Sequence, residues 1–186
     1  MVPWRPEKGV SYAAGIACIH YRKRAESEIL LVLTKEEIIR QTDGSDFVKR
    51  SAWQLPIGTF EPGKDADLVV TAIRETKEEA GYKLPRSAVE EAPYVSRGQP
   101  SDREGSDKHE TITFLVGLEE LPEKVHQAPD PHIKRVAWFP LSAVLTHYRP
   151  KLEGVAMASK HWYTLSMFAD QIRRIDKEKK GCKEFA

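Results

Sequence analysis

Three glutamates near the middle of the chain are spaced so that they can act together. Glu75, Glu78 and Glu79 occupy positions i, i+3 and i+4, which share one face of an α-helix. Like charges one turn apart destabilise a helix unless a positive charge neutralises them, and hard carboxylate oxygens suit Mg²⁺ or Mn²⁺. The spacing therefore predicts a divalent-metal site. Arg74 and Lys77 lie in the same segment and could balance the negative charge. The alternative is therefore an ordinary exposed helix without a metal.

The residues before the glutamates predict the elements that position them. The segment Trp53–Gly63 reads as an apolar strand that runs into a turn-rich loop. Asp67 suits the N-cap of the following helix, and Gly81 suits the residue just after its end, where a left-handed backbone costs glycine little. Strand, glycine loop and acidic helix thus form one ordered unit.

This unit resembles the Nudix box of the Nudix hydrolases, written G-x5-E-x7-R-E-U-x-E-E-x-G-U with U an aliphatic residue. Five residues fall in register with its second half: Arg74, Glu75, Glu78, Glu79 and Gly81.

The first half of the unit departs from the box. Counting forward from Gly58 places Lys64 where the first glutamate belongs, and counting back from Arg74 places Ala66 there. Nine residues instead of seven separate Lys64 from Arg74, so two residues are inserted. A non-catalytic Nudix domain that only binds its ligand is therefore an alternative to an enzyme.

The resemblance implies a reaction and the residues that perform it. The reaction is hydrolysis of a diphosphate linkage in a small-molecule polyphosphate, with Mg²⁺ or Mn²⁺ as cofactor. The implied metal ligands are Gly58, through its carbonyl, and Glu75, Glu78 and Glu79. We assign Glu78 as general base and Arg74 as the residue that orients a carboxylate. The sequence alone does not separate the roles of the three glutamates, and Glu110 is a candidate for a further ligand or base.

Two Nudix subfamilies share further features with the chain. The helix is similar to that of the asymmetric diadenosine tetraphosphate hydrolases, which usually carry Pro-Lys-Gly where this chain has Pro56–Gly58. The diphosphoinositol polyphosphate phosphohydrolases resemble it over a wider span, including Arg135–Phe139 and His147–Pro150, but their Lys-x-Arg pair is missing at Ser11–Gly15. The implied substrates are dinucleoside polyphosphates, diphosphoinositol polyphosphates or a related nucleoside diphosphate derivative. Nucleotide-pool cleansing and mRNA-cap hydrolysis are the alternative reactions.

Substrates of this kind need several cations converging on one concavity, and arginine binds phosphate bidentately. The candidate phosphate contacts are Arg97, Arg103, Lys108, His109, Arg149 and Lys151. An adenine would stack on Tyr12, Tyr94 or Tyr148, although each of these also suits a core or rim position.

Length and composition suit one domain. The 186 residues, 40% of them hydrophobic, fit a single domain over 1–186 with a core at about 10–175 and a charged tail at 177–186. A net charge of +1 gives no sign of nucleic-acid or membrane binding, and no stretch approaches the roughly 18 apolar residues of a membrane span. Two cysteines make neither a disulfide framework nor a zinc site, so we expect a cytoplasmic or nuclear protein. The oligomeric state is not determined by the sequence.

Hydrophobic periodicity predicts the remaining elements. The expected strands are Tyr12–Tyr21 and Glu28–Leu33, which form a hairpin, a short strand at 94–96, and His109–Leu118 and Lys134–Pro140. The expected helices after them are Leu141–Tyr148 and Val155–Ile175, and Lys35–Arg50 is expected to be a long polar insertion. Together they predict an α/β (α+β) fold, a mixed β-sheet sandwiched between α-helices, as the resemblance also implies.

Overall fold

The computed structural model of the chain describes residues 5–6, 10–22, 25–40, 45–92, 94–98, 109–125 and 130–181, with the backbone alone at Ile39, 94–98 and 179–181. Within these residues the central sheet has the strand order β11-β2-β1-β9-β8, with β5 paired to β2 and β6 to β1. Its strands are β1 (Ser11–His20), β2 (Glu28–Thr34), β5 (Trp53–Gln54), β6 (Ile57–Thr59), β8 (Tyr94–Gly98), β9 (His109–Leu118) and β11 (Ile133–Pro140).

The sheet is mixed, as predicted. Strands β1 and β2 pair antiparallel as the expected hairpin, whereas β1 and β9 pair in parallel over their whole length, from Ser11↔His109 to His20↔Leu118. The two longest partners of the sheet therefore come from distant parts of the sequence. Both strands are buried in their middle sections, which matches their continuous apolar character.

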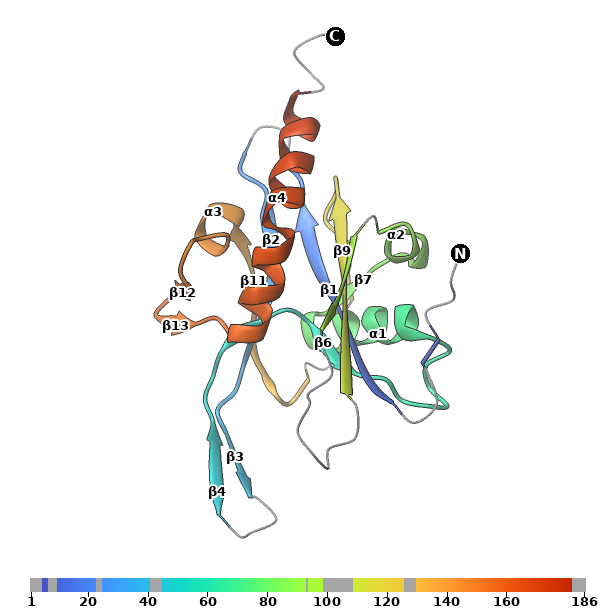
Figure 1. Ribbon diagram of the computed structural model, residues 1–186, viewed down its shortest axis with the longest axis vertical. Coiled ribbons are helices and arrows are strands. Elements are labelled where there is room, and N and C mark those ends of the chain that lie inside the picture. Colours follow the sequence, from blue (N-terminus) through green and yellow to red (C-terminus); the bar gives the residue numbers. More distant parts are fainter. Residues whose placement is uncertain are drawn as a thin grey trace.

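Helices cover both faces of the sheet because side chains alternate along its strands. On β1, Ala14 and Ile16 belong to a core that includes α1 (Leu68–Ala80) and α2 (Arg86–Glu90). Ala17 and Ile19 belong to the opposite core, which includes α3 (Leu141–Val144) and α4 (Ser159–Gly181). Figure 1 shows α1 and α4 on opposite sides of the central strands.

The predicted ends of the acidic helix are confirmed. The Asp67 side chain accepts a hydrogen bond from the Val70 amide at 2.9 Å, as an N-cap does. Gly81 adopts φ 71°, ψ 24°, and its amide donates to the Lys77 carbonyl. Because only glycine takes this left-handed conformation at little cost, Gly81 ends the helix and turns the chain into β7 (Tyr82–Lys83), which pairs with β10 (Glu123–Lys124).

The polar segment before β5 is more ordered than the sequence predicts. It forms an antiparallel hairpin of β3 (Glu37–Arg40) and β4 (Asp46–Lys49) that projects away from the sheet (Figure 1). Its β-forming residues pair across the hairpin, Ile38 opposite Val48 and Ile39 opposite Phe47. They stand among charged neighbours, and because the segment is polar on average, the sequence did not predict these strands.

The C-terminal helix has different bounds from the predicted ones. Residues Val155–Ala156 form β13, which pairs with β12 (Lys151–Leu152), and α4 begins only at Ser159. The helix then continues to Gly181, so the first part of the predicted charged tail is helical. The buried residues Leu165, Phe168 and Ile172 form the apolar face of this helix, and α3 is shorter than the predicted helix from Leu141 to Tyr148.

Candidate active site

Strand β6 lies directly against the acidic face of α1. A Cβ atom added to Gly58 would lie 2.1 Å from the Glu75 carboxyl carbon and 2.2 and 2.3 Å from its oxygens. No side chain fits there, so glycine is required for the Gly58 backbone to approach this carboxylate. Glu75 is only 8% exposed. Its contact with Gly58 brings together two of the predicted metal ligands.

Glu79 is held beside the same strand. Its Oε2 accepts a hydrogen bond from the Ile57 amide at 2.9 Å. Burial raises the pKa of Glu79 to about 8; the Ile57 hydrogen bond opposes this rise, and the charges of Glu75 and Asp130 add to it. Burial also raises the pKa of Glu75, while the charge of Arg74 lowers it. A buried carboxylate surrounded by other carboxylates gains from a nearby cation, so these residues fit a divalent metal ion.

Arg74 connects the glutamates to the preceding loop. Its Nη1 donates to Glu75 Oε1 at 2.7 Å and to Glu78 Oε2 at 2.8 Å. Its Nε and Nη2 each donate to Asp65 at 2.9 Å, and Nη2 also donates to the Thr59 carbonyl at 3.0 Å. These contacts match the five N–H donors of a guanidinium, so the side chain is fixed in one position.

Asp65 is the site residue that sequence reasoning missed. Its side chain is buried, and it accepts a further hydrogen bond from the Glu61 amide at 2.9 Å. Burial alone would raise the pKa of Asp65, but the hydrogen bonds from Arg74 and Glu61 hold it below its usual value. In sequence Asp65 stands between Lys64 and Ala66, the two positions that counting from either end of the box selects. Relative to the box, one residue is inserted between Gly58 and Asp65 and one between Asp65 and Arg74. An acidic residue at this midpoint was the signal that could have identified Asp65.

The predicted phosphate-binding cations lie in more than one place. Arg149 Nη1 donates to Ser159 Oγ at 2.6 Å at the start of α4, and Lys151 is exposed on the nearby strand β12. His109 lies at the start of β9, with Nδ1 2.9 Å from Ser11 Oγ. Arg103 and Lys108 fall outside the described residues, and Arg97 is described only as backbone in β8. Convergence of these side chains on one concavity stays a prediction.

The structure corrects one candidate for adenine stacking. Tyr12 is 3% exposed inside the core on the α1 side of the sheet, so it has no free face for a ligand. Tyr148 is 85% exposed, and the side chain of Tyr94 is outside the described residues. Glu110, the candidate further ligand, lies opposite Tyr12 near the start of β9.

Two lysines near Glu79 escaped sequence reasoning as well. The charge of Lys49, at the end of β4, opposes the rise in the pKa of Glu79. The pKa of Lys160, in the first turn of α4, is lowered by burial and by the charge of Lys49, while the charge of Glu79 opposes that shift. Both lysines thus lie within electrostatic range of the acidic cluster. Neither belongs to a motif, so only the folded chain could have pointed to them.

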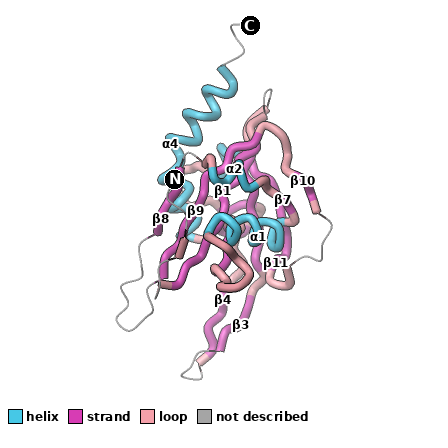
Figure 2. The backbone as a smooth tube through the Cα atoms, turned by 90° about the vertical axis from the view of Figure 1, so that its right-hand side faces the viewer, coloured by secondary structure: helices cyan, strands magenta, loops and turns pink. Residues whose placement is uncertain are grey.

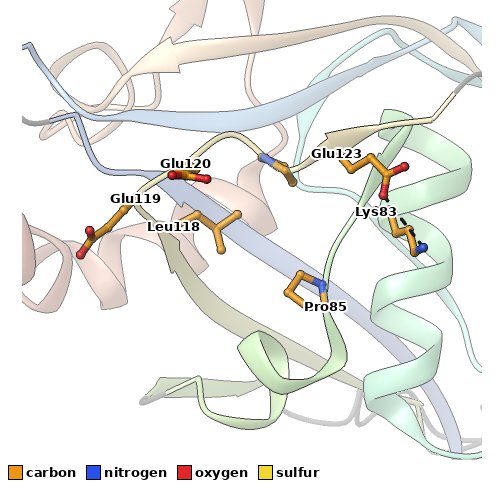
Figure 3. A pocket seen from close by; sticks show the side chains of 7 residues that line it. Lys83, Pro85, Leu118, Glu119, Glu120 and Glu123 are labelled. Carbon is orange, nitrogen blue, oxygen red and sulfur yellow. Dashed lines mark ion pairs between the residues drawn. The ribbon is translucent and has the colours of Figure 1, made fainter.

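A hollow of about 360 Å³ on another part of the surface does not belong to this site (Figure 3). It is lined by Lys83, Pro85, Leu118, Glu119, Glu120, Pro122 and Glu123. Lys83 there forms an ion pair with Glu123 at 3.9 Å. Three glutamates beside one paired lysine would repel a phosphate, and none of the α1 glutamates reaches the hollow.

The donor set on α1 fits a divalent cation, although it is not a closed cage. Among the described residues, no three His, Cys, Asp or Glu side chains are already placed to hold a metal. Arg74 and the Ile57 amide instead hold the carboxylates of Glu75, Glu78 and Glu79. Mg²⁺ keeps several of its waters, so a few oxygen ligands from such a cluster are sufficient. The assignment of individual ligands stays a prediction.

Three solved structures are similar to this chain in fold, and two of them were determined with a nucleotide ligand. The NUDIX domain of Shewanella oneidensis NrtR, determined with ADP ribose, is similar with a TM-score of 0.56 and 16% identity over 87% of each chain. A bifunctional NMN adenylyltransferase/ADP ribose pyrophosphatase from Francisella tularensis, determined with AMP and a manganese ion, gives 0.56 and 18% identity over 89% of this chain and 43% of that one. A MutT/nudix family protein from Enterococcus faecalis is similar with a TM-score of 0.54 and 18% identity, over 89% of this chain and 64% of that chain. Likeness at these identities shows the fold alone.

Two further findings bear on the expectations from sequence. Among the described residues, none of the helices combines the length and the apolar character that a membrane crossing needs. No curated protein matches the chain. The profile of the NUDIX domain, in contrast, matches residues 12–164, which is most of the chain, and the chain therefore belongs to the NUDIX family.

Proposed function

We propose that this chain is a Mg²⁺-dependent pyrophosphohydrolase that cleaves a diphosphate linkage in a small-molecule polyphosphate. The observation that carries the proposal is the cluster of three glutamates on α1, packed against Gly58 and fixed by Arg74. Such a cluster attracts a divalent cation, and a polyphosphate is the substrate class that most needs one.

The cation would be held by Glu75, Glu79 and the Gly58 carbonyl, with Glu78 as a further ligand or the base. When bound, it would neutralise charge on the phosphate oxygens and lower the pKa of water. Glu75 and Glu79 flank the Ile57–Gly58 backbone and are the more buried members of the cluster, which suits them to hold a cation.

Glu78 is the glutamate best placed to take a proton. Its side chain is 46% exposed, so water and substrate can reach it, whereas the side chain of Glu75 is 11% exposed. Arg74 holds Glu78 Oε2 at 2.8 Å and thereby limits the orientations of the carboxylate. A base that is both accessible and oriented is what proton abstraction from water requires.

Dinucleoside polyphosphates and diphosphoinositol polyphosphates are the proposed substrates. Arg149 and Lys151 near the start of α4, together with Lys49 and Lys160 near Glu79, offer cations for a chain of phosphates. Residues Tyr12–Gly15 at the start of β1 are core residues without a cation. A ring that carries many phosphates would find no cation there, so the dinucleoside polyphosphates are favoured.

A substrate panel tests the proposal. The protein would be incubated with Mg²⁺ or Mn²⁺ and diadenosine tetraphosphate, a diphosphoinositol polyphosphate, ADP-ribose, nucleoside triphosphates or capped RNA. We expect cleavage of a diphosphate linkage, with products that reveal which bond breaks. No product from any compound, under conditions in which a verified NUDIX hydrolase turns over, would refute the proposal.

Glu78→Gln tests the assigned base. We expect activity to fall by about 10² to 10⁴, since this is the range that general bases contribute, while the folded structure is kept. Glu120→Gln, on the exposed segment after β9, is the matched control and should leave activity unchanged. Equal activity of the wild type and Glu78→Gln would show that Glu78 is not the base.

A NUDIX-fold module that binds a ligand without turnover is the second candidate. It is motivated by the missing glutamate at the first acidic position of the box. Because Asp65 supplies a carboxylate to Arg74 in that region, the missing glutamate does not leave the arginine unpaired. Saturable binding in the substrate panel without any product would favour this candidate over the enzyme.

A further inference from the structure

A hollow of about 220 Å³ opens at the C-terminal end of α1, beside the glutamates of the candidate active site. Figure 2 shows β7, β10 and β11 gathered at this end of the helix. The hollow is lined by Glu78, Glu79, Ala80, Gly81, Tyr82, Lys124, Val125, Val136 and Trp138. Two of the catalytic glutamates therefore border a second space whose other walls are largely aromatic and aliphatic.

The aromatic walls are fixed by contacts within the protein. The rings of Tyr82 and Trp138 lie 5.7 Å apart at an interplanar angle of 71°, and Trp138 Nε1 donates to the Tyr82 hydroxyl at 3.1 Å. His20 meets the same indole at 6.0 Å and 68°. Neither neighbour lies parallel on the indole, so neither stacks on it as a flat ligand would.

The indole and backbone N–H groups described at the rim are already paired. The Trp138 N–H is used by Tyr82, the Val125 amide donates to the Gly81 carbonyl at 2.9 Å, and the Gly81 amide donates to Lys77. Apart from the Lys124 ammonium group, few donors remain among the described residues of the rim that could recognise the edge of a ligand. The walls therefore favour contact with a flat hydrophobic face over recognition by hydrogen bonds.

The size of the hollow limits what it can take. Pockets for whole small-molecule ligands measure about 300–1,000 Å³, so a space of about 220 Å³ accommodates one ring system of a larger substrate. Because Glu78 and Glu79 border the hollow, a group seated here lies next to a phosphate chain held at the acidic cluster. Lys124 adds a cation to the same lining.

We propose that this hollow is the subsite for one nucleobase of a nucleotide substrate. The proposal rests on the proposed function, which supplies the adjoining phosphate chain, and it selects nucleotides over diphosphoinositol polyphosphates, which have no flat ring. Because every nucleobase has a π-face and the rim offers few free donors, the subsite tolerates purines of either kind.

Equilibrium binding of AMP, without metal and without turnover, is the test. AMP, GMP and ribose 5-phosphate would be titrated into the wild type, Trp138→Leu, Trp138→Phe and Val136→Phe by calorimetry. We expect AMP and GMP to bind at least tenfold more tightly than ribose 5-phosphate. Trp138→Leu should remove that advantage, Trp138→Phe should keep most of it, and Val136→Phe should block it by filling the hollow. Trp162→Phe, on the opposite core, is the control.

Two results would overturn the subsite. One is equal affinity of the wild type for AMP and ribose 5-phosphate. The other is an unchanged AMP affinity in Val136→Phe, whose larger ring fills the space without removing Trp138. Should Trp138→Leu unfold, Val136→Phe alone decides. Since binding is measured without catalysis, AMP binding that depends on these residues would support the subsite even if the substrate panel gave no product. If the substrate panel showed cleavage but AMP binding did not depend on Trp138 and Val136, the proposed function would stand and the subsite would be rejected.

Discussion

The acidic face of α1 and the basic side chains expected to meet the substrate are held in different ways. Arg74 alone makes five hydrogen bonds that join Glu75, Glu78, Asp65 and the Thr59 carbonyl. Arg149, in contrast, is exposed, and among the described residues its side chain donates one hydrogen bond, to Ser159.

This difference suggests separate roles: the acidic face of α1 sets the geometry of catalysis, and the basic side chains set the affinity for substrate. A cation and a base must be held within fractions of an ångström, and the buried network around Arg74 provides such rigidity. Exposed lysine and arginine side chains attract a phosphate, but they lose rotamer entropy when it binds. They therefore contribute affinity and do not fix the geometry of the reacting groups. Changes on α1 should therefore affect turnover, and changes among the basic residues should affect substrate affinity.

Among the variants that compare these two regions further, Glu79→Gln should have the largest effect. It removes a carboxylate held by the Ile57 amide, so we expect Mg²⁺-dependent activity to fall by at least about 100-fold, the upper end of what outer-shell partners of a metal contribute. Mg²⁺ titrations of kcat/KM, with Glu120→Gln as control, would measure it. Full activity at ordinary Mg²⁺ concentrations would remove Glu79 from the site.

Gly58→Ala tests whether strand β6 must touch the glutamates. The new Cβ would lie 2.1 Å from the Glu75 carboxyl carbon, so the carboxylate or the strand must move. We expect a loss of about 1–3 kcal/mol in the free energy of unfolding and a clear drop in activity. Gly63→Ala is the control, since a Cβ there meets no atom within 4 Å although its φ of 95° strains the backbone. Gly63→Ala should lower the stability without lowering kcat. If Gly63→Ala lowered kcat as much as Gly58→Ala does, the role of Gly58 would be contradicted.

Asp65→Asn tests the anchor of Arg74. Losing a charged partner of two hydrogen bonds should cost about 1.5–3 kcal/mol of stability and reduce activity about tenfold. Lys64→Glu instead places a glutamate at the position counted from Gly58, where the exposed Lys64 side chain forms an ion pair with Glu61 at 2.6 Å. It should leave activity nearly unchanged. A gain of activity in Lys64→Glu would mean that Asp65 does not replace the missing glutamate.

The pH dependence of stability tests the buried charge of Glu79. Its pKa is about 8 in the folded protein against 4.5 without perturbation, so the folded state binds the proton more tightly. The stability that this proton provides is fully present below about pH 4.5 and is lost as the pH rises through 8. Without metal, the contribution of Glu79 to the free energy of unfolding should fall by at most about 1.4 kcal/mol per pH unit, and by less where solvent screens the side chain. Thermal unfolding of the wild type and Glu79→Gln from pH 5 to 8 would measure it, and identical slopes would contradict it.

Arg149→Ala should have the smallest effect. We expect KM for a polyphosphate substrate to rise about three- to tenfold with kcat nearly unchanged, and the rise to shrink at high salt. His109→Ala, at the start of β9, is the comparison and should change KM less. A large fall of kcat in Arg149→Ala would place this arginine in the catalytic network and would end the distinction between the two regions.

Local patterns account for the parts of the molecule that sequence analysis predicted well. Asp67 and Gly81 bound α1 because capping and left-handed turns depend on a few neighbouring residues. The strand from His109 to Leu118 has the predicted bounds because its apolar run is long and continuous. The hairpin of β3 and β4 was missed because short strands among charged residues leave a weak pattern.

The sequence by itself determined the family, the mixed α/β fold and the acidic face of α1, since each depends on residue order and on the 3.6-residue period of a helix. Only the tertiary structure decided that Asp65 anchors Arg74, that Gly58 touches Glu75, and that Lys49 and Lys160 lie near Glu79. These relations join residues on different elements, and their distances are set when the sheet and its two cores pack. No local pattern encodes that packing.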